Sequence, residues 1–450
     1  MTPTYEPRED DFQPSRVTER IAQDWQPSLT YWQDAWRRLV RNRRARVSLW
    51  IVVAIAAFTT FGPEIWRVDA NAQSLTQISV APTLGRWALL VSEPAKQMPA
   101  AAAPSFGAAE TPTTESVQLV WQEVPGATQY RLFRHEYPPS GEYDLGLPLA
   151  TLDAGEHSYQ DRLRLESRHY YYTLVVEHTG TRPSYRRVEI TPQQAITRRE
   201  ALRLGLLSGE NDARLWVKLP AHPFGTDALG RDMLARLMQG ARTSLFIGVV
   251  APLVFILLGV AYGGLSGFIG GWTDREMMRV ADFVMALPFV LFMILFRIMF
   301  GLGPGESGVL PMLVALIALS WPVTARLVRA QVLQSRGLAF VDAARLLGAG
   351  PIYIVARHLL PNLLSAVLVS LTFAIPTAIF TEAFLSFIGM GVVPPTPSWG
   401  SLCNEGLDSV LSHPHELIFP SLFISITVLA FNILGDGLRD CLDVRLRVTM

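Results

Sequence analysis

The chain has 450 residues and no formal net charge, and its composition is 50% hydrophobic but only 17% charged. An ordinary soluble domain carries about 25% charged residues, so this composition favours a membrane protein. Zero net charge gives no reason to expect a nucleic-acid partner. Two cysteines, Cys403 and Cys441, are too few for a disulfide framework.

Six stretches are apolar enough to cross a bilayer, which takes about 20 residues of helix. The first, 47–66, follows an arginine-rich tail (1–46) and lacks a clear small-residue cleavage site, so we expect a retained anchor rather than a secretory signal. The other five lie in a helical core, 244–439, which a short tail (440–450) follows. They are 244–268, 278–302, 309–328, 363–389 and 417–435.

The arginines predict the orientation of these spans. Arginines follow the second, fourth and sixth spans, whereas the 301–308 and 389–416 loops contain neither lysine nor arginine. Because short cytoplasmic loops carry the excess of positive charge, we expect both termini in the cytoplasm and these two loops outside. Residues 67–243 are then external as well.

The external segment is expected to have three parts. A linker (67–114) includes a Pro/Ala-rich stretch, and 115–192 has the alternating pattern of short strands. Its segments WQEVPGATQYRLFR (121–134) and HYYYTLVVEH (169–178) resemble a fibronectin type III domain, which implies a β-sandwich that serves as a docking surface or spacer, or is a tolerated insertion. The third part, 193–243, is predicted to be amphipathic, with a helical stretch over 193–219 and an interfacial helix within 222–245.

The second span carries a glycine at every fourth position, at Gly259, Gly263, Gly267 and Gly271. This spacing gives one helix face without side chains, which allows another helix to approach closely. Either tight packing or a sliding interface would use such a face. Pro288, Pro322 and Pro376 lie within later spans and predict kinks there.

The loop between the fourth and fifth spans, 341–362, reads VDAARLLGAGPIYIVARHLLPN. It predicts a short helix with an acidic start at Asp342 and small residues at Ala343 and Ala344. Gly348 would end that helix, and Pro351 could begin another. A short helix with a small-residue face can dock into a groove on another protein, and its arginines would suit an acidic rim.

This loop resembles the coupling loop of binding-protein-dependent ABC importers, whose pattern is E-A-A, three residues, G, nine residues and I-x-L-P. Asp342 stands in place of the glutamate and His358 in place of the isoleucine. The second departure resembles the Arg-His-x-Leu-Pro form of the peptide branch of these importers. The residues that the resemblance assigns to ATPase coupling are Asp342, Ala343, Ala344, Arg345, Gly348, His358 and Pro361.

Further segments support the same family: HPFGTDALGRD (222–232), GGWTDREMMRVAD (270–282), FLSFIGMGVVPPTPSWGSL (384–402) and LAFNILGDGLRDCLDVRL (429–446). They resemble the C-type permease subunit of dipeptide, oligopeptide and nickel importers. The resemblance implies an all-α polytopic fold of six spans in a bacterial inner membrane. It also implies a sister permease, two ATPases, an external binding protein and surrounding lipid as partners.

The two lysines, Lys96 and Lys218, test for an ATPase within the chain. A P-loop needs a lysine after its second glycine, and neither lysine lies in such a frame. We therefore expect a transporter subunit rather than an enzyme, with no cofactor of its own. ATP and Mg²⁺ would be bound by the partner ATPases.

Charged residues within spans are candidates for the translocation path, because they are costly in lipid and often functional. Arg297 and Glu382 are the candidates, although snorkelling or structural pairing would also explain them. Asp282 is expected to pair with Arg279 or Arg275. No His/Cys cluster has metal-ligand spacing, so no metal site is predicted.

Di- or oligopeptides are the predicted substrates, with nickel or another small solute as the alternative. A membrane-anchored receptor that uses the β-domain would explain the insertion but not the 341–362 loop. A secondary transporter would require internal repeats, and these are not visible in the sequence.

Overall fold

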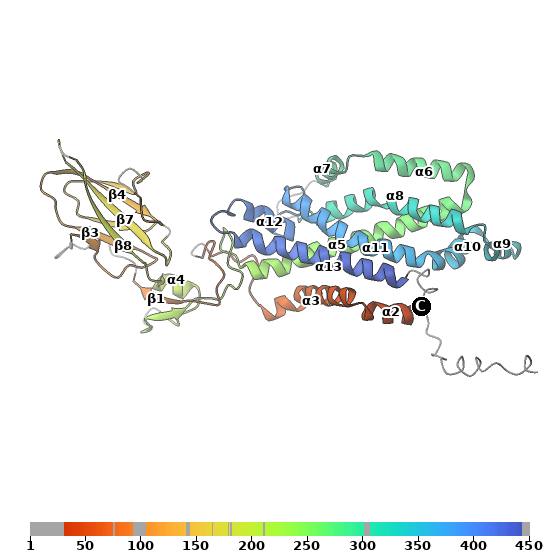
Figure 1. Ribbon diagram of the computed structural model, residues 1–450, viewed down its shortest axis with the longest axis horizontal. Coiled ribbons are helices and arrows are strands. Elements are labelled where there is room, and N and C mark those ends of the chain that lie inside the picture. Colours follow the sequence, from red (N-terminus) through yellow and green to blue (C-terminus); the bar gives the residue numbers. More distant parts are fainter. Residues whose placement is uncertain are drawn as a thin grey trace, which may run out of the picture. The chain divides into compact units, whose positions relative to one another are not determined.

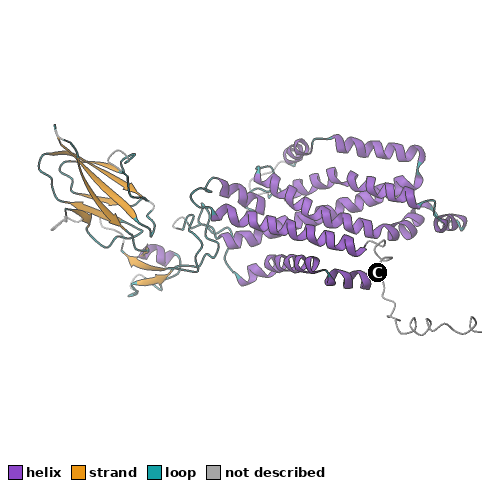
Figure 2. Ribbon diagram, viewed as in Figure 1, coloured by secondary structure: helices purple, strands orange, loops and turns teal. Residues whose placement is uncertain are grey.

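The computed structural model describes residues 31–442, apart from 75–76, 93–104, 141–144, 164, 179, 181, 210–211 and 301–306 (Figure 1). The chain forms two compact units. The helical unit comprises residues 1–81 and 224–450, and the inserted unit comprises residues 82–223. Figure 2 shows that helices dominate the first unit and strands the second.

The helical unit is built mainly from long helices. Its elements are α2 (Tyr31–Arg41), α3 (Arg43–Ile65), α5 (Met233–Ile269), α6 (Gly271–Ala286), α7 (Phe289–Met299), α8 (Val309–Ser335), α9 (Ala339–Leu346), α10 (Pro351–Ile354), the π-helical turn η2 (Val355–Leu359), α11 (Leu360–Phe387), α12 (Trp399–Leu407) and α13 (His415–Leu442). Within this unit, α12 lies at one end and α9 at the other (Figure 1). We call these the α12 end and the α9 end.

Polar side chains cap several of these helices. Asn42 accepts hydrogen bonds from the backbone N–H groups of Arg44 and Ala45 at the start of α3. Asp232 accepts one from Ala235 at 2.7 Å and so begins α5. Ser398 and Ser401 form a reciprocal capping box at α12. Each cap satisfies a backbone donor that the first helical turn leaves free.

Five helices or continuous helical stretches among the described residues are long and apolar enough to cross a membrane: α3, α5, α8, the stretch Pro351–Phe387 and α13. The pair α6 and α7 passes the same test together, but the two helices meet at an angle of 85°. The prediction of a span over 278–302 is therefore only partly right. Pro288 lies at the bend, where it caps α7, whereas α8 and α11 continue through Pro322 and Pro376.

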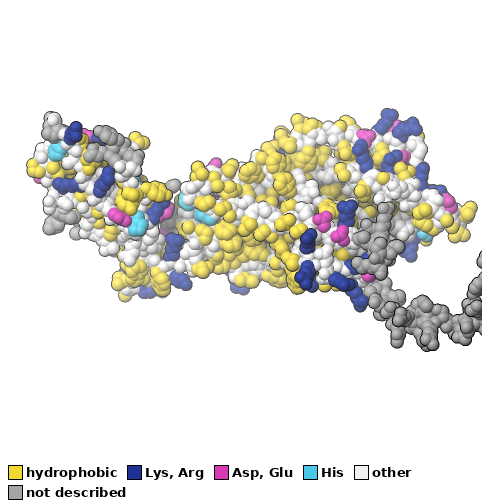
Figure 3. Space-filling model, viewed as in Figure 1, with side chains coloured by type: hydrophobic (Ala, Val, Ile, Leu, Met, Phe, Trp, Pro, Cys, Tyr) yellow, Lys and Arg dark blue, Asp and Glu magenta, His cyan; other side chains and the backbone are white. Residues whose placement is uncertain are grey.

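The core of the helical unit lies between α5, α8, α11 and the 341–362 loop. Ile247, Ile256, Leu316 and Val328 belong to this buried cluster, and Leu359 extends it into the loop. Hydrophobic side chains cover much of the unit's visible face (Figure 3), as expected for surface that contacts lipid.

The described residues of the inserted unit form three sheets. A three-stranded sheet has the order β2-β3-β6, and a four-stranded sheet has the order β5-β4-β7-β8. Their strands are β2 (Phe106–Ala108), β3 (Val117–Trp121), β4 (Ala127–His135), β5 (Ala150–Asp153), β6 (Ser158–Asp161), β7 (Tyr170–His178) and β8 (Ser184–Ile190). All neighbouring strands in these two sheets are antiparallel.

The two larger sheets share one core. Trp121 on β3 is buried with Tyr130 on β4 and Tyr172 on β7, and their side chains belong to a single cluster. The rings of Trp121 and Tyr130 meet edge to face with centroids 5.6 Å apart. The aromatic strands that the sequence predicted are therefore the strands that hold the two sheets together.

The third sheet corrects two predictions. Its order is β10-β1-β9, with β1 (Trp87–Val91), β9 (Ala195–Thr197) and β10 (Trp216–Lys218). Strand β1 falls in the predicted linker, as does β2, and the Pro/Ala-rich part of that linker falls largely on 93–104, outside the described residues. A helix was predicted over 193–219, but only α4 (Arg198–Arg203) is helical there. The residues before and after α4 form β9 and β10, which both pair with β1.

The predicted interfacial helix within 222–245 is also wrong as a separate element. Residues 222–232 form a hydrogen-bonded loop, with an isolated bridge between Thr226 and Asp232. From Met233 the chain is already in α5 and continues without interruption into the apolar span. The Asp232 cap explains where the helix begins.

Candidate functional site

The 341–362 loop lies at the α9 end of the helical unit. Asp342 is in the first turn of α9, where its negative charge is favourable to the helix dipole, and it pairs with Arg345 at 3.3 Å. Gly348 follows with φ of +82°. The N–H of Gly348 donates to the carbonyl of Arg345, and that of Ala349 donates to Ala344. This left-handed turn ends α9 as the sequence predicted.

One side of the loop is anchored in the bundle. Val341, Ala344, Ile354 and Leu359 are buried in the main core of the helical unit. The Arg345 guanidinium also lies over the ring of Phe268, at the end of α5, 5.0 Å from its centroid. Movement of the loop would therefore act directly on α5.

The opposite side of the loop is exposed and apolar. Leu346 and Leu347 are 89% and 88% exposed, and Ile352 and Tyr353 are exposed beside them. The expected small-residue docking face is thus only half right. Ala343 is exposed, but Ala344 packs inward, so large apolar side chains offer most of the accessible surface.

The remaining predicted residues of the loop lie after α10. His358 is half-buried in η2, and its ring meets that of Tyr353 edge to face at 5.8 Å. Its backbone carbonyl accepts a hydrogen bond from Asn362 at 2.9 Å. Pro361 is exposed in the first turn of α11, where a proline costs no helix hydrogen bond.

Three of the four spaced glycines face α8 at close range. A Cβ atom on Gly259 would lie 2.6 Å from the Thr324 Cβ, and one on Gly263 would lie 2.1 Å from the Ala325 carbonyl oxygen. A Cβ on Gly267 would lie 2.9 Å from the Arg329 carbonyl oxygen. Gly271 does not share this contact, because it begins α6 after the turn and has open space around it.

Charged residues in the spans have partners on other helices. Asp282 on α6 pairs with Arg326 on α8, so the predicted pairing with Arg279 or Arg275 is wrong. The Asp274 carboxylate on α6 accepts two hydrogen bonds from the Arg329 guanidinium on α8, at 2.5 and 2.6 Å. These pairs tie α6 to α8 alongside the glycine contact, in addition to the packing of apolar side chains.

The two candidate path residues differ in exposure. Arg297 on α7 is half-buried and donates to the Gly389 carbonyl after α11. Glu382 on α11 is completely buried. It accepts a hydrogen bond from Ser386 at 2.8 Å, and the Ser244 and Ser398 hydroxyls also lie against it. Glu382 is thus enclosed between α5, α11 and the start of α12.

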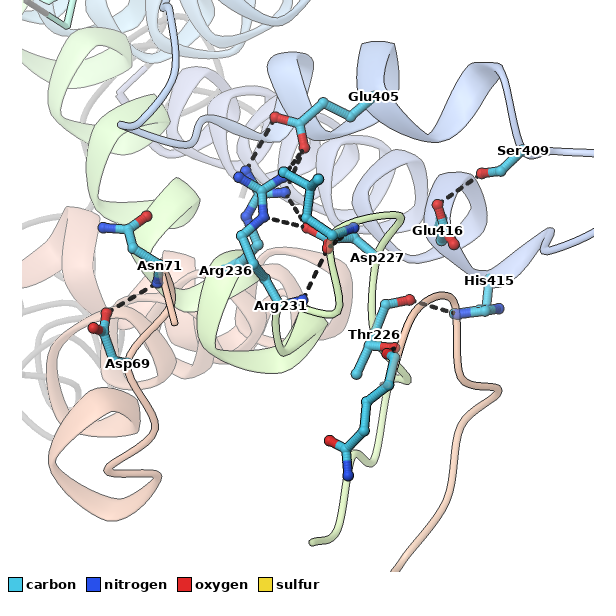
Figure 4. Close-up of polar contacts among 12 residues, drawn as sticks. Asp69, Asn71, Thr226, Asp227, Arg231, Arg236, Glu405, Ser409, His415 and Glu416 are labelled. Carbon is cyan, nitrogen blue, oxygen red and sulfur yellow. Dashed lines mark hydrogen bonds and ion pairs between the residues drawn. The ribbon is translucent and has the colours of Figure 1, made fainter. Parts of the chain in front are cut away.

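A buried ion cluster holds the α12 end together (Figure 4). Arg236 donates to Asp227 at 2.7 Å and to both carboxylate oxygens of Glu405, at 2.5 and 3.0 Å. Arg231 donates to the same two carboxylates at 2.7 and 2.6 Å. Asp227, Arg231 and Arg236 are all buried. The cluster connects the loop before α5 to α12, and we call it the outer ion cluster because the arginine pattern predicts that this end faces outward.

A small cavity of about 20 Å³ lies next to this cluster, lined by Arg236, Glu405 and Glu416 among others. Glu416 accepts a hydrogen bond from Ser409 at 2.7 Å through one carboxylate oxygen. His415 meets the Thr226 carbonyl at 3.1 Å nearby (Figure 4). These contacts add α13 to the connection between the 226–236 segment and α12.

Comparisons with known proteins decide the family. The model of the binding-protein-dependent transport system inner membrane component matches residues 242–448, and that of the N-terminal TM domain of oligopeptide transport permease C matches residues 30–82. The dipeptide transport system permease protein of Bacillus subtilis is 47% identical over 227 residues, which is 50% of this chain and 69% of that protein. The chain belongs to this family of inner membrane components.

Other relatives agree with that assignment. The oligopeptide transport system permease protein of Bacillus subtilis is 45% identical, over 50% of this chain and 72% of its own length. A glutathione transport system permease protein of Pectobacterium atrosepticum is 42% identical, over 50% of this chain and 74% of its own length. This chain is therefore a multi-pass permease subunit of a bacterial ABC importer.

Among solved structures, an inward-facing methionine ABC transporter is similar at a TM-score of 0.39 and 19% identity, over 47% of this chain and 98% of that one. The two family models leave residues 83–241 unmatched. The inserted unit of this permease, 82–223, falls almost entirely in that gap. The insertion is thus the main part of this permease that the two family models do not match.

Reasoning from the sequence missed the outer ion cluster of the permease. The HPFGTDALGRD motif contains Asp227 and Arg231, so the motif itself was a signal. Nothing in the sequence links it to Glu405, which lies far along the chain. The pairing of Asp274 with Arg329 was missed for the same reason. Among the described residues, the structure holds no group of metal-ligating side chains.

Proposed function

We propose that this permease subunit imports di- or oligopeptides, forms part of the translocation path and couples through the 341–362 loop to separate ATPase subunits. The relatives named above are permeases for dipeptides, oligopeptides and glutathione, which supports a peptide substrate over nickel or another solute. The proposed partners are a sister permease, two ATPases that bind ATP and Mg²⁺, and an external binding protein.

One observation carries the coupling proposal. The 341–362 loop presents Leu346, Leu347, Ile352 and Tyr353 to the outside while its other side is buried in the bundle. Exposed apolar side chains on a short, anchored helix are typical of a surface that a protein partner covers. The contact between Arg345 and Phe268 offers a route by which a displaced loop would tilt α5.

The orientation belongs to the same proposal. The arginine-rich loops on one side support a cytoplasmic location for both termini and the 341–362 loop, and an external one for the inserted unit and the outer ion cluster. Alternating access would then follow from ATP-driven movement of the loop. The outer ion cluster would keep the opposite end of the subunit fixed during that movement.

We further propose that residues 106–190 are a fibronectin type III-like sandwich. Three strands face four in the orders β2-β3-β6 and β5-β4-β7-β8, with Trp121 in the shared core. The Tyr170 hydroxyl accepts a hydrogen bond from the Glu166 N–H at 3.0 Å, as in the tyrosine corner of immunoglobulin-like folds. Burial and a hydrogen bond to Asp161 raise the pKa of Tyr172 in the same core.

The test is ATP-dependent uptake by the complete transporter in proteoliposomes, with labelled dipeptide and Ni²⁺ as competing substrates. Leu347→Glu places a charge on the exposed apolar surface, so we expect ATP-dependent peptide uptake to be lost while the subunit stays folded. Leu147→Glu is the matched control, because Leu147 is 93% exposed in the inserted unit. Normal uptake by Leu347→Glu would refute the coupling assignment, and transport of Ni²⁺ without peptide would refute the substrate.

A further inference from the structure

The small sheet of the inserted unit has one covered face and one open face. Side chains alternate between the faces of a strand. Ala88 on β1 is paired with Val217 on β10, and both are buried in a cluster with Ala201 of α4. The opposite face is formed by the alternate residues. These are Trp87 and Leu89 on β1, and Trp216 and Lys218 on β10.

The open face is aromatic, apolar and basic. Trp87 is 63% exposed and Trp216 is 41% exposed, and Leu84 is exposed just before β1. Trp87 is paired with Lys218, which is also exposed. Figure 3 shows hydrophobic side chains gathered over β1 and β10 with basic side chains at their border. We call this surface the β1–β10 face.

No acidic residue occurs in either stretch that forms this face, 83–91 or 214–220, whereas Arg86 and Lys218 are basic and exposed. Tryptophan is enriched where a protein meets the lipid headgroups, because its ring is apolar and its N–H is polar. Lysine and arginine next to it are attracted to the lipid phosphates. The composition of the face therefore matches a bilayer surface.

Short connectors join this face to the helical unit. The helical unit includes residues up to 81 and again from 224, so only residues 82–86 and 219–223 separate β1 and β10 from it. Five extended residues reach at most about 18 Å. Both connectors are thus short, and they bring the two strands of the face together.

A protein partner fits this face less well. A stable protein interface takes about 20–30 residues from each side. The open face of two strands, five residues on β1 and three on β10, offers far fewer. A membrane surface requires no matching shape, so a few tryptophans and basic residues are enough to bind it.

We propose that the β1–β10 face rests on the lipid bilayer, with Trp87 and Trp216 at the level of the headgroups and with Arg86 and Lys218 against lipid phosphates. The face then fixes the base of the inserted unit on the membrane. The proposal requires only that α3 and α5 cross the bilayer, and it is independent of the transported substrate and of ATPase coupling.

The experiment places a fluorophore on single cysteines in the full-length chain in lipid nanodiscs. Cys403→Ser and Cys441→Ser first remove the native thiols. Leu84→Cys then labels the face, and Leu147→Cys labels the exposed loop between β4 and β5 as the control. We expect a headgroup-attached spin label to quench the Leu84→Cys site several-fold more than the Leu147→Cys site. Iodide in the buffer should quench the Leu147→Cys site more than the Leu84→Cys site.

Each outcome decides the proposal. Equal quenching at the two sites by both quenchers would overturn it, because the face would then be in water. Protection of Leu84→Cys from both quenchers would also overturn it, because protein rather than lipid would then cover the face. Trp87→Cys provides a second labelling site on the face itself, with the same expected order.

The charges have their own test. In nanodiscs with phosphatidylglycerol, Arg86→Glu combined with Lys218→Glu should lower lipid quenching at the Leu84→Cys site several-fold, and phosphatidylcholine nanodiscs should show a smaller difference. Arg187→Glu on strand β8 is the matched control and should leave the quenching unchanged. If the double change left lipid quenching at the Leu84→Cys site unaltered, Arg86 and Lys218 would not contact the lipid phosphates.

Discussion

At the α12 end of the permease, opposite charges are enclosed by protein, whereas in the 341–362 loop at the α9 end they lie in the open. Asp227 is buried between Arg231 and Arg236 and accepts two further backbone hydrogen bonds. Asp342 has one partner, Arg345, at 3.3 Å, and both side chains are exposed. The same residue type is thus held in two very different ways.

This difference shows how one subunit can be tightly held at one end and loosely held at the other. Buried charges are costly unless they are paired, so the outer ion cluster favours the arrangement of α5 and α12 in which the two arginines meet Asp227 and Glu405. An exposed pair contributes little and restrains little. The 341–362 loop is therefore held by apolar anchors on one side and is open to a partner on the other.

The largest expected effect comes from removing the shared carboxylate of the outer ion cluster. Asp227→Ala leaves two buried arginines with Glu405 alone, and breaking a buried pair costs about 3–5 kcal/mol. We expect a fall of about 10 °C in the midpoint of thermal unfolding in detergent. Asp342→Ala is the matched control and should change the stability by less than about 1 kcal/mol. Equal shifts of the unfolding midpoint in the two variants would show that the charges at the α12 end are held no more tightly than those of the 341–362 loop.

A smaller effect is expected where α5 meets α8. Gly263→Ala would place a Cβ 2.1 Å from a backbone carbonyl oxygen that cannot move aside. Overpacking of this kind costs about 1–3 kcal/mol. Gly264→Ala is the control on the same helix, because its Cβ would meet only the end of the Val355 side chain at 3.3 Å. Thermal unfolding of both variants measures the difference, and a stable Gly263→Ala would show that the helices separate freely.

Local chemistry explains which parts of the fold the sequence predicts. Gly348 and Pro351 mark the turn in the 341–362 loop because a left-handed residue and a first-turn proline have few alternatives. The long apolar runs predict the spans for a similar reason, since an unpaired backbone is too costly in lipid. Trp121 and the 170–178 run predict strands through their alternation and bulk.

The missed features depend on contacts between distant parts of the chain. Asp227 meets Glu405, and Asp282 meets Arg326 rather than the nearer Arg279, because the helices decide which charges become neighbours. Strand β1 looked like linker because its parallel partner, β9, lies about a hundred residues later. Ala344 turns inward for the same kind of reason, since the bundle next to α9 is not visible in the loop's own pattern.

The smallest effect on stability tests the turn of the 341–362 loop. Gly348 has φ of +82° and open space around it, so an added Cβ meets no neighbour but strains the backbone. A left-handed conformation costs a residue with a side chain about 1–2 kcal/mol, and Gly348→Ala should lose about that much locally. Because the turn is exposed, relaxation within the loop should keep the global unfolding midpoint close to that of the parent.

The informative readout for this variant is coupling rather than stability. A distorted turn moves Leu347 relative to the Arg345 and Phe268 contact, so we expect peptide uptake per ATP hydrolysed to fall while the transporter still assembles. Gly337→Ala is the matched control, because Gly337 also has open space but lacks a positive φ. If both variants transported normally, the loop would tolerate distortion, and the exposed apolar side chains rather than the turn geometry would have to carry the coupling.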